Sequence, residues 1–249
     1  MSSHSDNLNT FLNTLREKWR EVPASTQDRA FSGDLLSLPD AELLQLWQGW
    51  YENNCAGTGY SVRGWYHELY RSLAREGGRW LEVGSGLGYD GTYFARCGAQ
   101  VTFVDIVETN LRIIERICRL SDIRNVSFVL MRDLADLNQL GRFDCLLAVG
   151  SLINAPYEMM CEERRILANH LENGGRWLEL CYPRERWIRE GSLPFTDWGK
   201  KTDGERTPWV EWYDTPKLLH ALQPHSFDVV TSLNFHDNDF NWFDLIKRA

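Results

Sequence analysis

The sequence lacks any long hydrophobic run, and no stretch approaches the roughly 18 apolar residues that indicate a membrane-spanning helix. Its first residues, MSSHSDNLNT, are polar and do not supply the apolar segment of a secretory signal. The six cysteines form no C-x-x-C pair, and most lie among apolar residues. We therefore expect a cytoplasmic protein with reduced thiols, no membrane partner, no disulfide and no structural zinc.

Positive charge is also scarce. The chain has 27 Lys and Arg residues against 35 Asp and Glu residues, a formal net charge of −8, and no basic block. A long-range field that would gather nucleic acid is therefore not expected, and a small-molecule substrate is favoured. No group of side chains has the spacing of a metal site, so we expect no metal. The sequence leaves a homodimer open as a protein partner.

Residues 80–105, WLEVGSGLGYDGTYFARCGAQVTFVD, predict a strand, a glycine loop, a helix and a second strand. The expected strands are residues 80–83 and 100–105, and the expected helix is residues 89–97. Alternating glycines allow the backbone to pass close to a ligand, and the start of the following helix presents free N–H groups. This order is a βαβ unit that favours nucleotide binding.

Two acidic residues indicate which nucleotide this unit binds. Asp105 lies 23 residues after Glu82, close to the spacing of about 20 residues that is typical of a ribose-binding acid. Gly86, Gly88 and Gly91 also fit the dinucleotide pattern G-x-G-x-x-G, which leaves a nicotinamide enzyme or a ligand-free α/β domain as alternatives. The charge of Glu82, just before the loop, would oppose a pyrophosphate, so a cationic cofactor without phosphate fits better.

The segment EVGSGLG at residues 82–88 resembles the first motif of the class I S-adenosylmethionine-dependent methyltransferases, an acidic residue followed by alternating glycines. The resemblance implies an α/β fold with a seven-stranded, mostly parallel, doubly wound sheet, an antiparallel last strand and N-terminal helices. It also implies S-adenosylmethionine as the cofactor and a substrate of the small-molecule type. The predicted cofactor contacts are Tyr60, Arg63, Glu82, Gly84, Ser85, Gly86, Asp90, Asp105, Ile106, Asp133, Leu134 and Gly150.

Two groups of these contacts depend on the resemblance. In this family a helical segment before the first strand often packs over the cofactor, which suggests Tyr60, Arg63 and Tyr66; the alternative is packing for Tyr66 and solvation for Arg63. In the same family an acid after the third strand commonly accepts a hydrogen bond from the adenine amino group, which suggests Asp133. A helix cap is the alternative role of Asp133.

The hydrophobic periodicity divides the chain into an N-terminal helical cap, residues 1–78, and a catalytic domain, residues 79–249, in one compact unit. Residues 183–214 lack periodicity and predict a long insertion whose aromatic side chains act as a lid or only hold the insertion down. In the cap, helices are expected at 6–22, 39–51 and 61–76. Beyond the βαβ unit, helices are expected at 108–120, 156–171 and 215–222, and strands at 126–131, 144–149, 176–182, 227–234 and 239–247.

The central strand, residues 144–149, ends in a segment that would lie near the methyl group if the cofactor spans the carboxyl ends of the strands. The tetrapeptide at residues 154–157, NAPY, echoes the Asn-Pro-Pro-Tyr motif of nucleic-acid amino-methyltransferases, but a plain turn in which Pro156 starts a helix is the alternative. The predicted substrate contacts are Ser151, Asn154, Tyr182, Trp209 and Trp212.

The turn between the last two strands contains the predicted catalytic residues His236 and Asp237. If the sixth strand runs parallel to the first, this turn faces the substrate, although it could equally be a solvated turn. Histidine titrates nearest to neutral pH, so His236 would accept the acceptor's proton while Asp237 orients it. The sequence predicts methyl transfer to an O or N atom of a small metabolite or natural-product intermediate. The alternatives are an NAD(P)-dependent oxidoreductase, a protein or RNA methyltransferase, and a non-catalytic binding domain.

Overall fold

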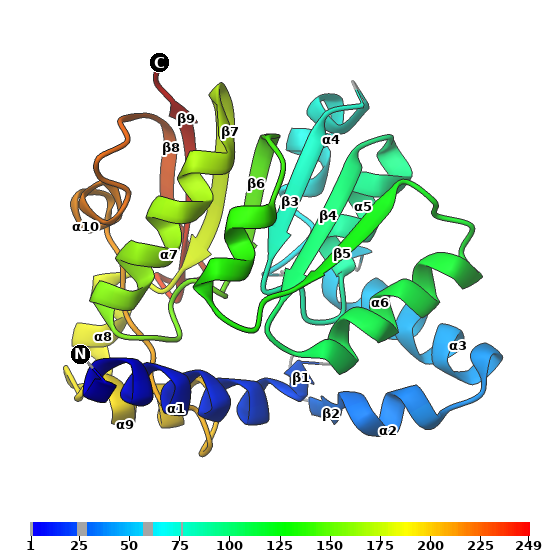
Figure 1. Ribbon diagram of the computed structural model, residues 1–249, viewed down its shortest axis with the longest axis horizontal. Helices are drawn as coiled ribbons and strands as arrows, with labels where there is room; N and C mark the ends of the chain where they lie inside the picture. Colours follow the sequence, from blue (N-terminus) through cyan, green and yellow to red (C-terminus); the bar gives the residue numbers. More distant parts are fainter. Residues whose placement is uncertain (1, 24–28, 57–61, 76) are drawn as a thin grey trace. The chain divides into compact units, whose positions relative to one another are not determined.

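The computed structural model describes residues 2–23, 29–56, 62–75 and 77–249 (Figure 1). It contains a seven-stranded sheet with the order β5-β4-β3-β6-β7-β9-β8, and β9 runs antiparallel to both of its neighbours. This mostly parallel sheet with an antiparallel last strand confirms the predicted fold class. The strands are β3 (Arg79–Val83), β4 (Gln100–Asp105), β5 (Val126–Leu130), β6 (Phe143–Val149), β7 (Leu171–Cys181), β8 (Phe227–Phe235) and β9 (Phe240–Lys247).

The chain forms two compact units, and one of them comprises residues 19–131. In this unit the parallel strands β3, β4 and β5 alternate with α5 (Tyr89–Cys97) and α6 (Glu108–Leu120), and both helices have the predicted bounds. Its other elements are β1 (Glu21–Pro23), β2 (Arg29–Phe31), α2 (Ser32–Ser37), α3 (Asp40–Tyr51), η1 (Glu52–Ala56) and α4 (His67–Arg75). One apolar cluster joins α2, α3, α6 and the glycine loop through Val22, Leu35, Leu43, Trp47, Leu87, Tyr89, Ile113 and Ile117.

The N-terminal elements differ from the sequence prediction in three places. Helix α1 (Ser2–Trp19) ends before residue 22, because residues 21–23 pair with β2 instead. Residues 52–56 lie beyond the expected end of the second helix at residue 51, but they continue it as one π-helical turn. Helix α4 starts at His67 rather than residue 61: Gly64 has a φ of 86°, a left-handed conformation that a helix does not accommodate.

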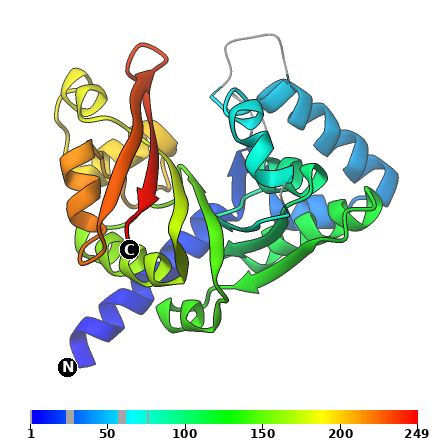
Figure 2. The ribbon, with the colours of Figure 1, turned by 90° about the horizontal axis from the view of Figure 1, so that it is seen from above.

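The other unit comprises residues 1–18 and 132–249. Strand β6 pairs in parallel with β7, while β9 pairs antiparallel with β7 and β8, so β8 runs in the direction of β7. Strands β8 and β9 form the red hairpin in Figure 2. The helical elements are η2 (Leu134–Gln139), α7 (Tyr157–His170), α8 (Arg184–Arg189), α9 (Phe195–Asp203) and α10 (Thr215–Ala221).

The insertion at residues 183–214 is more regular than its sequence suggested. It contains the short helices α8 and α9, which hydrophobic periodicity did not indicate. Backbone hydrogen bonds join it to the strand ends of the same unit: Glu211 N donates to Ile153 O at 2.8 Å, and Tyr213 N donates to Tyr182 O at 2.9 Å. Helix α8 is held by contacts that are distant in sequence, because Arg186 and Arg189 donate to the backbone carbonyls of Asp239 and Asp237. The role of the insertion as a lid stays a prediction.

No helix among the described residues combines the length and the apolar character needed to span a bilayer.

A buried ion pair joins α7 to β7. Arg164 Nη2 lies 2.5 Å from Glu179 Oε1, and both side chains have no exposed surface. The same nitrogen donates to Leu152 O at 2.8 Å, and Trp177 Nε1 donates to Glu179 Oε2 at 2.7 Å. The Arg164 guanidinium also lies 4.1 Å from the ring centroid of Tyr213. Such dense hydrogen bonding is what a charged pair requires in a dry interior.

We expect Glu179→Gln to lower the free energy of unfolding by about 3 kcal/mol or more, because it leaves the Arg164 charge buried without a charged partner. Urea denaturation would measure the change. The control is Glu172→Gln, whose partner Arg142 is 47% exposed; removal of that charge is expected to cost less than about 1 kcal/mol. Equal effects of the two substitutions would contradict the role assigned to the buried pair.

Candidate active site

The glycine loop that follows β3 depends on left-handed backbone at alternating positions. Gly84, Gly86 and Gly88 have φ angles of 68°, 55° and 69°, which side-chain-bearing residues rarely adopt. Gly84 N donates to Val104 O at 2.8 Å, and Gly88 N donates to Ser85 O at 2.7 Å. An ideal Cβ at Gly86 would meet no described atom within 4 Å. The loop is thus fixed to β4 and leaves open space beside Gly86.

Glu82 lies beneath this loop. Its side chain is 4% exposed, and its Oε2 accepts a hydrogen bond from Gly91 N at 3.1 Å. Burial and the nearby charge of Asp90 raise the pKa of Glu82 well above its ordinary value. A Cβ at Gly91 would lie 2.4 Å from Glu82 Oε2 and 2.4 Å from Phe103 Cε1. Residue 91 must therefore be glycine, because any side chain would overlap Glu82 and Phe103 of β4.

Asp105, at the end of β4, holds the loop from the neighbouring strand. Its Oδ2 accepts from Gly86 N at 3.0 Å, and its Oδ1 accepts from Val107 N at 2.8 Å. The side chain is 5% exposed. Burial raises the pKa of Asp105 to about 6, although the two backbone N–H groups favour the ionised form. Ile106, the next residue, is half-buried, and Ser85 donates its hydroxyl to Glu82 O at 3.2 Å.

Asp90, in the first turn of α5, is completely buried. Its Oδ1 accepts from Tyr66 Oη at 2.7 Å and lies 2.7 Å from His67 Nε2, while its Oδ2 pairs with Arg63. Burial would raise the pKa of Asp90, but Arg63 and the hydrogen bonds from His67 and Tyr66 outweigh it and hold the pKa at about 2. The structure thus joins the predicted contacts Arg63 and Asp90. Tyr60 lies outside the described residues.

Trp47, in α3, is a loop contact that the sequence analysis missed. Its Nε1 donates to Leu87 O at 2.8 Å inside the glycine loop. The Trp47 ring stacks on Tyr51 with a centroid separation of 5.4 Å. In the sequence, Leu43, Leu44, Trp47 and Trp50 have the spacing of a helix face that packs in a core. No local signal distinguishes a loop-binding indole from ordinary packing.

The unit of residues 1–18 and 132–249 contains the predicted cofactor contacts that follow β5. Asp133 is the N-cap of η2: its Oδ1 accepts from Ala135 N at 2.8 Å, and Asp136 completes a capping box. The alternative role as a helix cap is therefore present in the structure, and the adenine contact stays a prediction. Leu134 is half-buried.

The segment that leaves β6 starts at Gly150, which has a φ of 66° and donates to Leu180 O at 3.0 Å. Ser151 is half-buried and Asn154 is 5% exposed. Pro156 is the N-cap of α7, as the plain-turn alternative for residues 154–157 expected.

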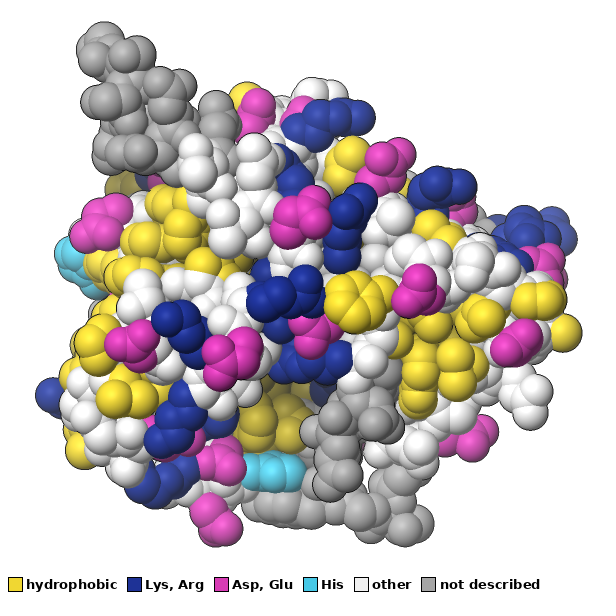
Figure 3. Space-filling model, turned by 90° about the horizontal axis from the view of Figure 1, so that it is seen from below, with side chains coloured by type: hydrophobic (Ala, Val, Ile, Leu, Met, Phe, Trp, Pro, Cys, Tyr) yellow, Lys and Arg dark blue, Asp and Glu magenta, His cyan; other side chains and the backbone are white. Residues whose placement is uncertain are grey.

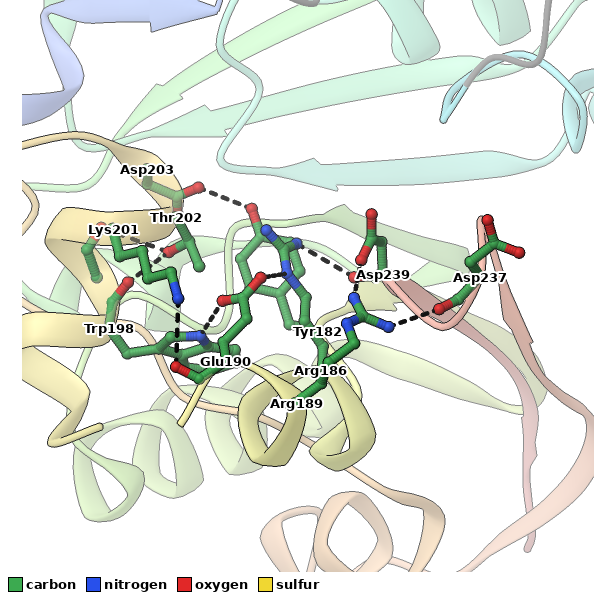
Figure 4. Close-up of polar contacts among 11 residues, drawn as sticks. Tyr182, Arg186, Arg189, Glu190, Trp198, Lys201, Thr202, Asp203, Asp237 and Asp239 are labelled. Atoms are coloured by element: carbon green, nitrogen blue, oxygen red, sulfur yellow. Dashed lines mark hydrogen bonds and ion pairs between the residues drawn. The ribbon is translucent and has the colours of Figure 1, made fainter. Parts of the chain in front are cut away.

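The side chain of Asp203 joins two predicted substrate contacts, and its contact with Tyr182 is drawn in Figure 4. Tyr182 Oη donates to Asp203 Oδ1 at 2.7 Å, and Asn154 Nδ2 lies 3.4 Å from Asp203 Oδ2. Asp203 is 7% exposed, and the Arg186 guanidinium lies 4.3 Å from the Tyr182 ring centroid. The sequence analysis missed Asp203 because it lies in α9, within the segment without periodicity.

The predicted catalytic turn follows β8. His236, Asp237 and Asn238 all have φ angles between 52° and 62°. Arg189 of α8 donates to Asp237 O at 2.7 Å and pairs with the Asp239 carboxylate (Figure 4). Strand β8 runs in the direction of β7 of the same unit, so the turn lies at the edge where β7 ends. The proton-accepting role of His236 stays a prediction.

The predicted lid contacts Trp209 and Trp212 bond within their own segment and to α10. Trp209 Nε1 donates to Glu211 Oε2 at 2.9 Å. The Lys217 ammonium lies 3.9 Å from the Trp212 ring centroid and 2.5 Å from Glu211 Oε1. These contacts fix the orientation of both indoles relative to α10.

A family model described as Methyltransferase domain matches residues 59–232, which is more than half of the chain. The chain belongs to this methyltransferase family. It is a methyltransferase that depends on S-adenosylmethionine, which confirms the resemblance carried by residues 82–88. A search of curated proteins finds no match of significant similarity.

Solved structures share the methyltransferase's fold at low sequence identity. Magnesium protoporphyrin IX methyltransferase (ChlM) from Synechocystis PCC 6803, with bound SAH, has a TM-score of 0.54 and 17% identity, covering 78% of this chain and 90% of that one. An S-adenosylmethionine-dependent methyltransferase from Clostridium acetobutylicum has a TM-score of 0.57 and 11% identity, covering 74% and 90%. The CcbJ methyltransferase from Streptomyces caelestis has a TM-score of 0.56 and 13% identity, covering 73% and 88%.

We expect Gly91→Ala to destabilise the methyltransferase by about 1 to 3 kcal/mol, because the added methyl group overlaps Glu82 and Phe103. Thermal and urea unfolding would measure the change. Gly49→Ala, in α3, is the control: nothing described lies within 4 Å of its Cβ, so higher helix propensity should leave stability equal or slightly raised. A neutral Gly91→Ala would contradict the close approach of α5 to Glu82.

A pH dependence follows from Asp105. Its folded-state pKa of about 6 exceeds the unfolded value of about 3.9, so the folded chain binds more protons between these pH values. The contribution of Asp105 to the free energy of unfolding therefore falls by an amount on the order of 3 kcal/mol as the pH rises from about 4 to 6. The stability of wild type minus that of Asp105→Asn, measured by urea unfolding at each pH, should fall across this window. Parallel pH profiles would contradict the raised pKa.

Proposed function

We propose that this methyltransferase transfers the methyl group of S-adenosylmethionine to an O or N atom of a small metabolite or natural-product intermediate. The observation that carries the proposal is the loop beneath which Glu82 is buried and to which Asp105 bonds directly. A carboxylate at the end of β4 suits a ribose diol, and the acidic Glu82 beneath the loop supplies no positive charge for the diphosphate of a dinucleotide. Arg63, Glu82, Gly84, Gly86 and Asp105 are the proposed cofactor residues of this unit.

The open space beside Gly86 supports the fit of a nucleoside cofactor. The bound cofactor supplies a sulfonium-activated methyl group, and the chain's own residues orient the acceptor and exclude water from it. Asn154, Tyr182 and Trp212 are proposed acceptor contacts, because they lie on the segments that follow β6 and β7 or on the insertion. His236 is the proposed group that accepts a proton from the acceptor oxygen or nitrogen.

A small substrate is further supported by the charge of the surface. On the face shown in Figure 3, Lys and Arg side chains lie among Asp and Glu side chains instead of forming a separate basic patch. The net charge of −8 also favours a small substrate over a nucleic acid.

Macromolecular acceptors are the second candidate. Incubation with radioactive cofactor and cell extract would distinguish them from small molecules, since macromolecules retain the label after precipitation. The cytoplasmic location stays a prediction.

The decisive test is a parallel calorimetric titration with S-adenosylmethionine, S-adenosylhomocysteine and NAD. We expect both sulfur nucleosides to bind and NAD to show no heat of binding. Asp105→Ala should weaken nucleoside affinity about tenfold or more, since hydrogen bonds to a charged group contribute roughly 1.5 to 3 kcal/mol.

Asp122→Ala is the matched control, because Asp122 is an exposed acid of the same unit and should leave affinity unchanged. A melting curve for each variant separates lost binding from lost folding. Undiminished affinity in a folded Asp105→Ala variant would refute the ribose contact, and preferential binding of NAD would refute the proposed transfer.

A further inference from the structure

Three side chains of metal-binding type meet in the unit of residues 19–131. The donor atoms of Cys55, His67 and Asp90 all lie within 4.8 Å of one another. His67 is 3% exposed and Asp90 is fully buried, while Cys55 is half-buried. The three residues come from η1, the first turn of α4 and the first turn of α5. No sequence spacing indicates such a site, which is why the sequence analysis expected no metal.

The backbone brings Cys55 and the start of α4 close together. Cys55 lies in the π-helical turn η1, a conformation often found at functional sites. A Cβ at Gly64 would lie 2.0 Å from the Cys55 carbonyl oxygen. Residue 64 must therefore be glycine for the turn before α4 to pass this close to η1.

Neighbouring groups hold two of the three donors in place. His67 stacks on Tyr93 with a centroid separation of 4.2 Å and an interplanar angle of 13°. Asp90 accepts hydrogen bonds from Tyr66 and Arg63. Metal-binding carboxylates and imidazoles are commonly oriented by such outer contacts.

The local charges suit a divalent cation. Asp90 and Glu82 are buried carboxylates that interact electrostatically with each other and with the Arg63 guanidinium. The Cys55 sulfur lies in the same field. Binding of a divalent cation would displace the proton of the Cys55 thiol, because a thiol that coordinates a metal is deprotonated.

We propose that Cys55, His67 and Asp90 bind one zinc ion. A thiolate, an imidazole and a carboxylate form a mixed donor set that zinc accepts, and three protein ligands leave a fourth position. His67 Nε2 and Asp90 Oδ1, now 2.7 Å apart, need to separate to about 3.3 Å for zinc with tetrahedral geometry and ordinary bond lengths. The bound ion would tie η1 and α4 to α5 beside the glycine loop.

The test is a titration of the chelator-treated full chain with CoCl2 and then with ZnCl2, followed by absorbance. We expect one equivalent of Co²⁺ to bind, with a sulfur-to-cobalt charge-transfer band in the near ultraviolet that Zn²⁺ abolishes. Cys55→Ser should remove the band, and Asp90→Asn should weaken Co²⁺ binding at least tenfold. Cys97→Ser is the control, because Cys97 lies in α5 outside the cluster and its loss should leave the titration unchanged.

Two results would overturn the site. One is a wild-type chain that binds no equivalent of Co²⁺ or shows no charge-transfer band. The other is a band that persists in Cys55→Ser. The wild-type measurement decides even where a variant fails to fold, and it requires neither cofactor nor methyl acceptor. Its outcome is thus independent of the proposed methyl transfer.

Discussion

Hydrogen bonds from the backbone of Gly86 and Gly91 to two buried carboxylates fix the glycine loop. Asp105 reaches the loop from β4, and Glu82 reaches the first turn of α5 from β3. A loop with three left-handed glycines has many accessible conformations in the unfolded chain, so ordering it costs conformational entropy. The carboxylates offset part of this cost and define one conformation. Because α5 follows the loop directly, the bond from Gly91 to Glu82 also fixes the position of its first turn.

The same contacts place negative charge where water is excluded. Burial raises the pKa of both Asp105 and Glu82, so their ionised forms reduce the stability of the protein without ligand. A sequence selected only for the stability of the ligand-free protein would have apolar residues at these two positions. Their presence is understandable if a hydroxyl-bearing, cationic ligand interacts with them, since binding then recovers the free energy that folding lost. The lower stability of the ligand-free protein and the proposed affinity for the cofactor thus have the same cause, the burial of these two carboxylates.

The parts of the fold that the sequence predicted are those with strong local patterns. The bounds of α5, β4 and α6 followed from apolar periodicity and glycine punctuation, and Glu82 and Asp105 followed from their spacing around the loop. The start of α4 could not be predicted, because the sequence does not show that Gly64 adopts a left-handed conformation. The helices α8 and α9 and the role of Asp203 could not be predicted either, because they depend on contacts between residues far apart in sequence. Trp47 shows the intermediate case. Its burial was predictable from helical spacing, but its hydrogen bond to Leu87 O required the loop to be in place.

The unit of residues 1–18 and 132–249 shows how recognition of the methyl acceptor could vary without a change in the glycine loop. Its insertion is joined to the segments that follow β6 and β7 by backbone hydrogen bonds of Glu211 and Tyr213, which do not depend on side-chain identity. Helix α8 then binds the turn after β8 through Arg186 and Arg189 (Figure 4). Side chains such as Tyr182 and Trp212 are therefore held on a fixed backbone while their own chemistry is free to change. Specificity for an acceptor would then reside in the insertion, whereas the glycine loop retains the requirements of a shared cofactor.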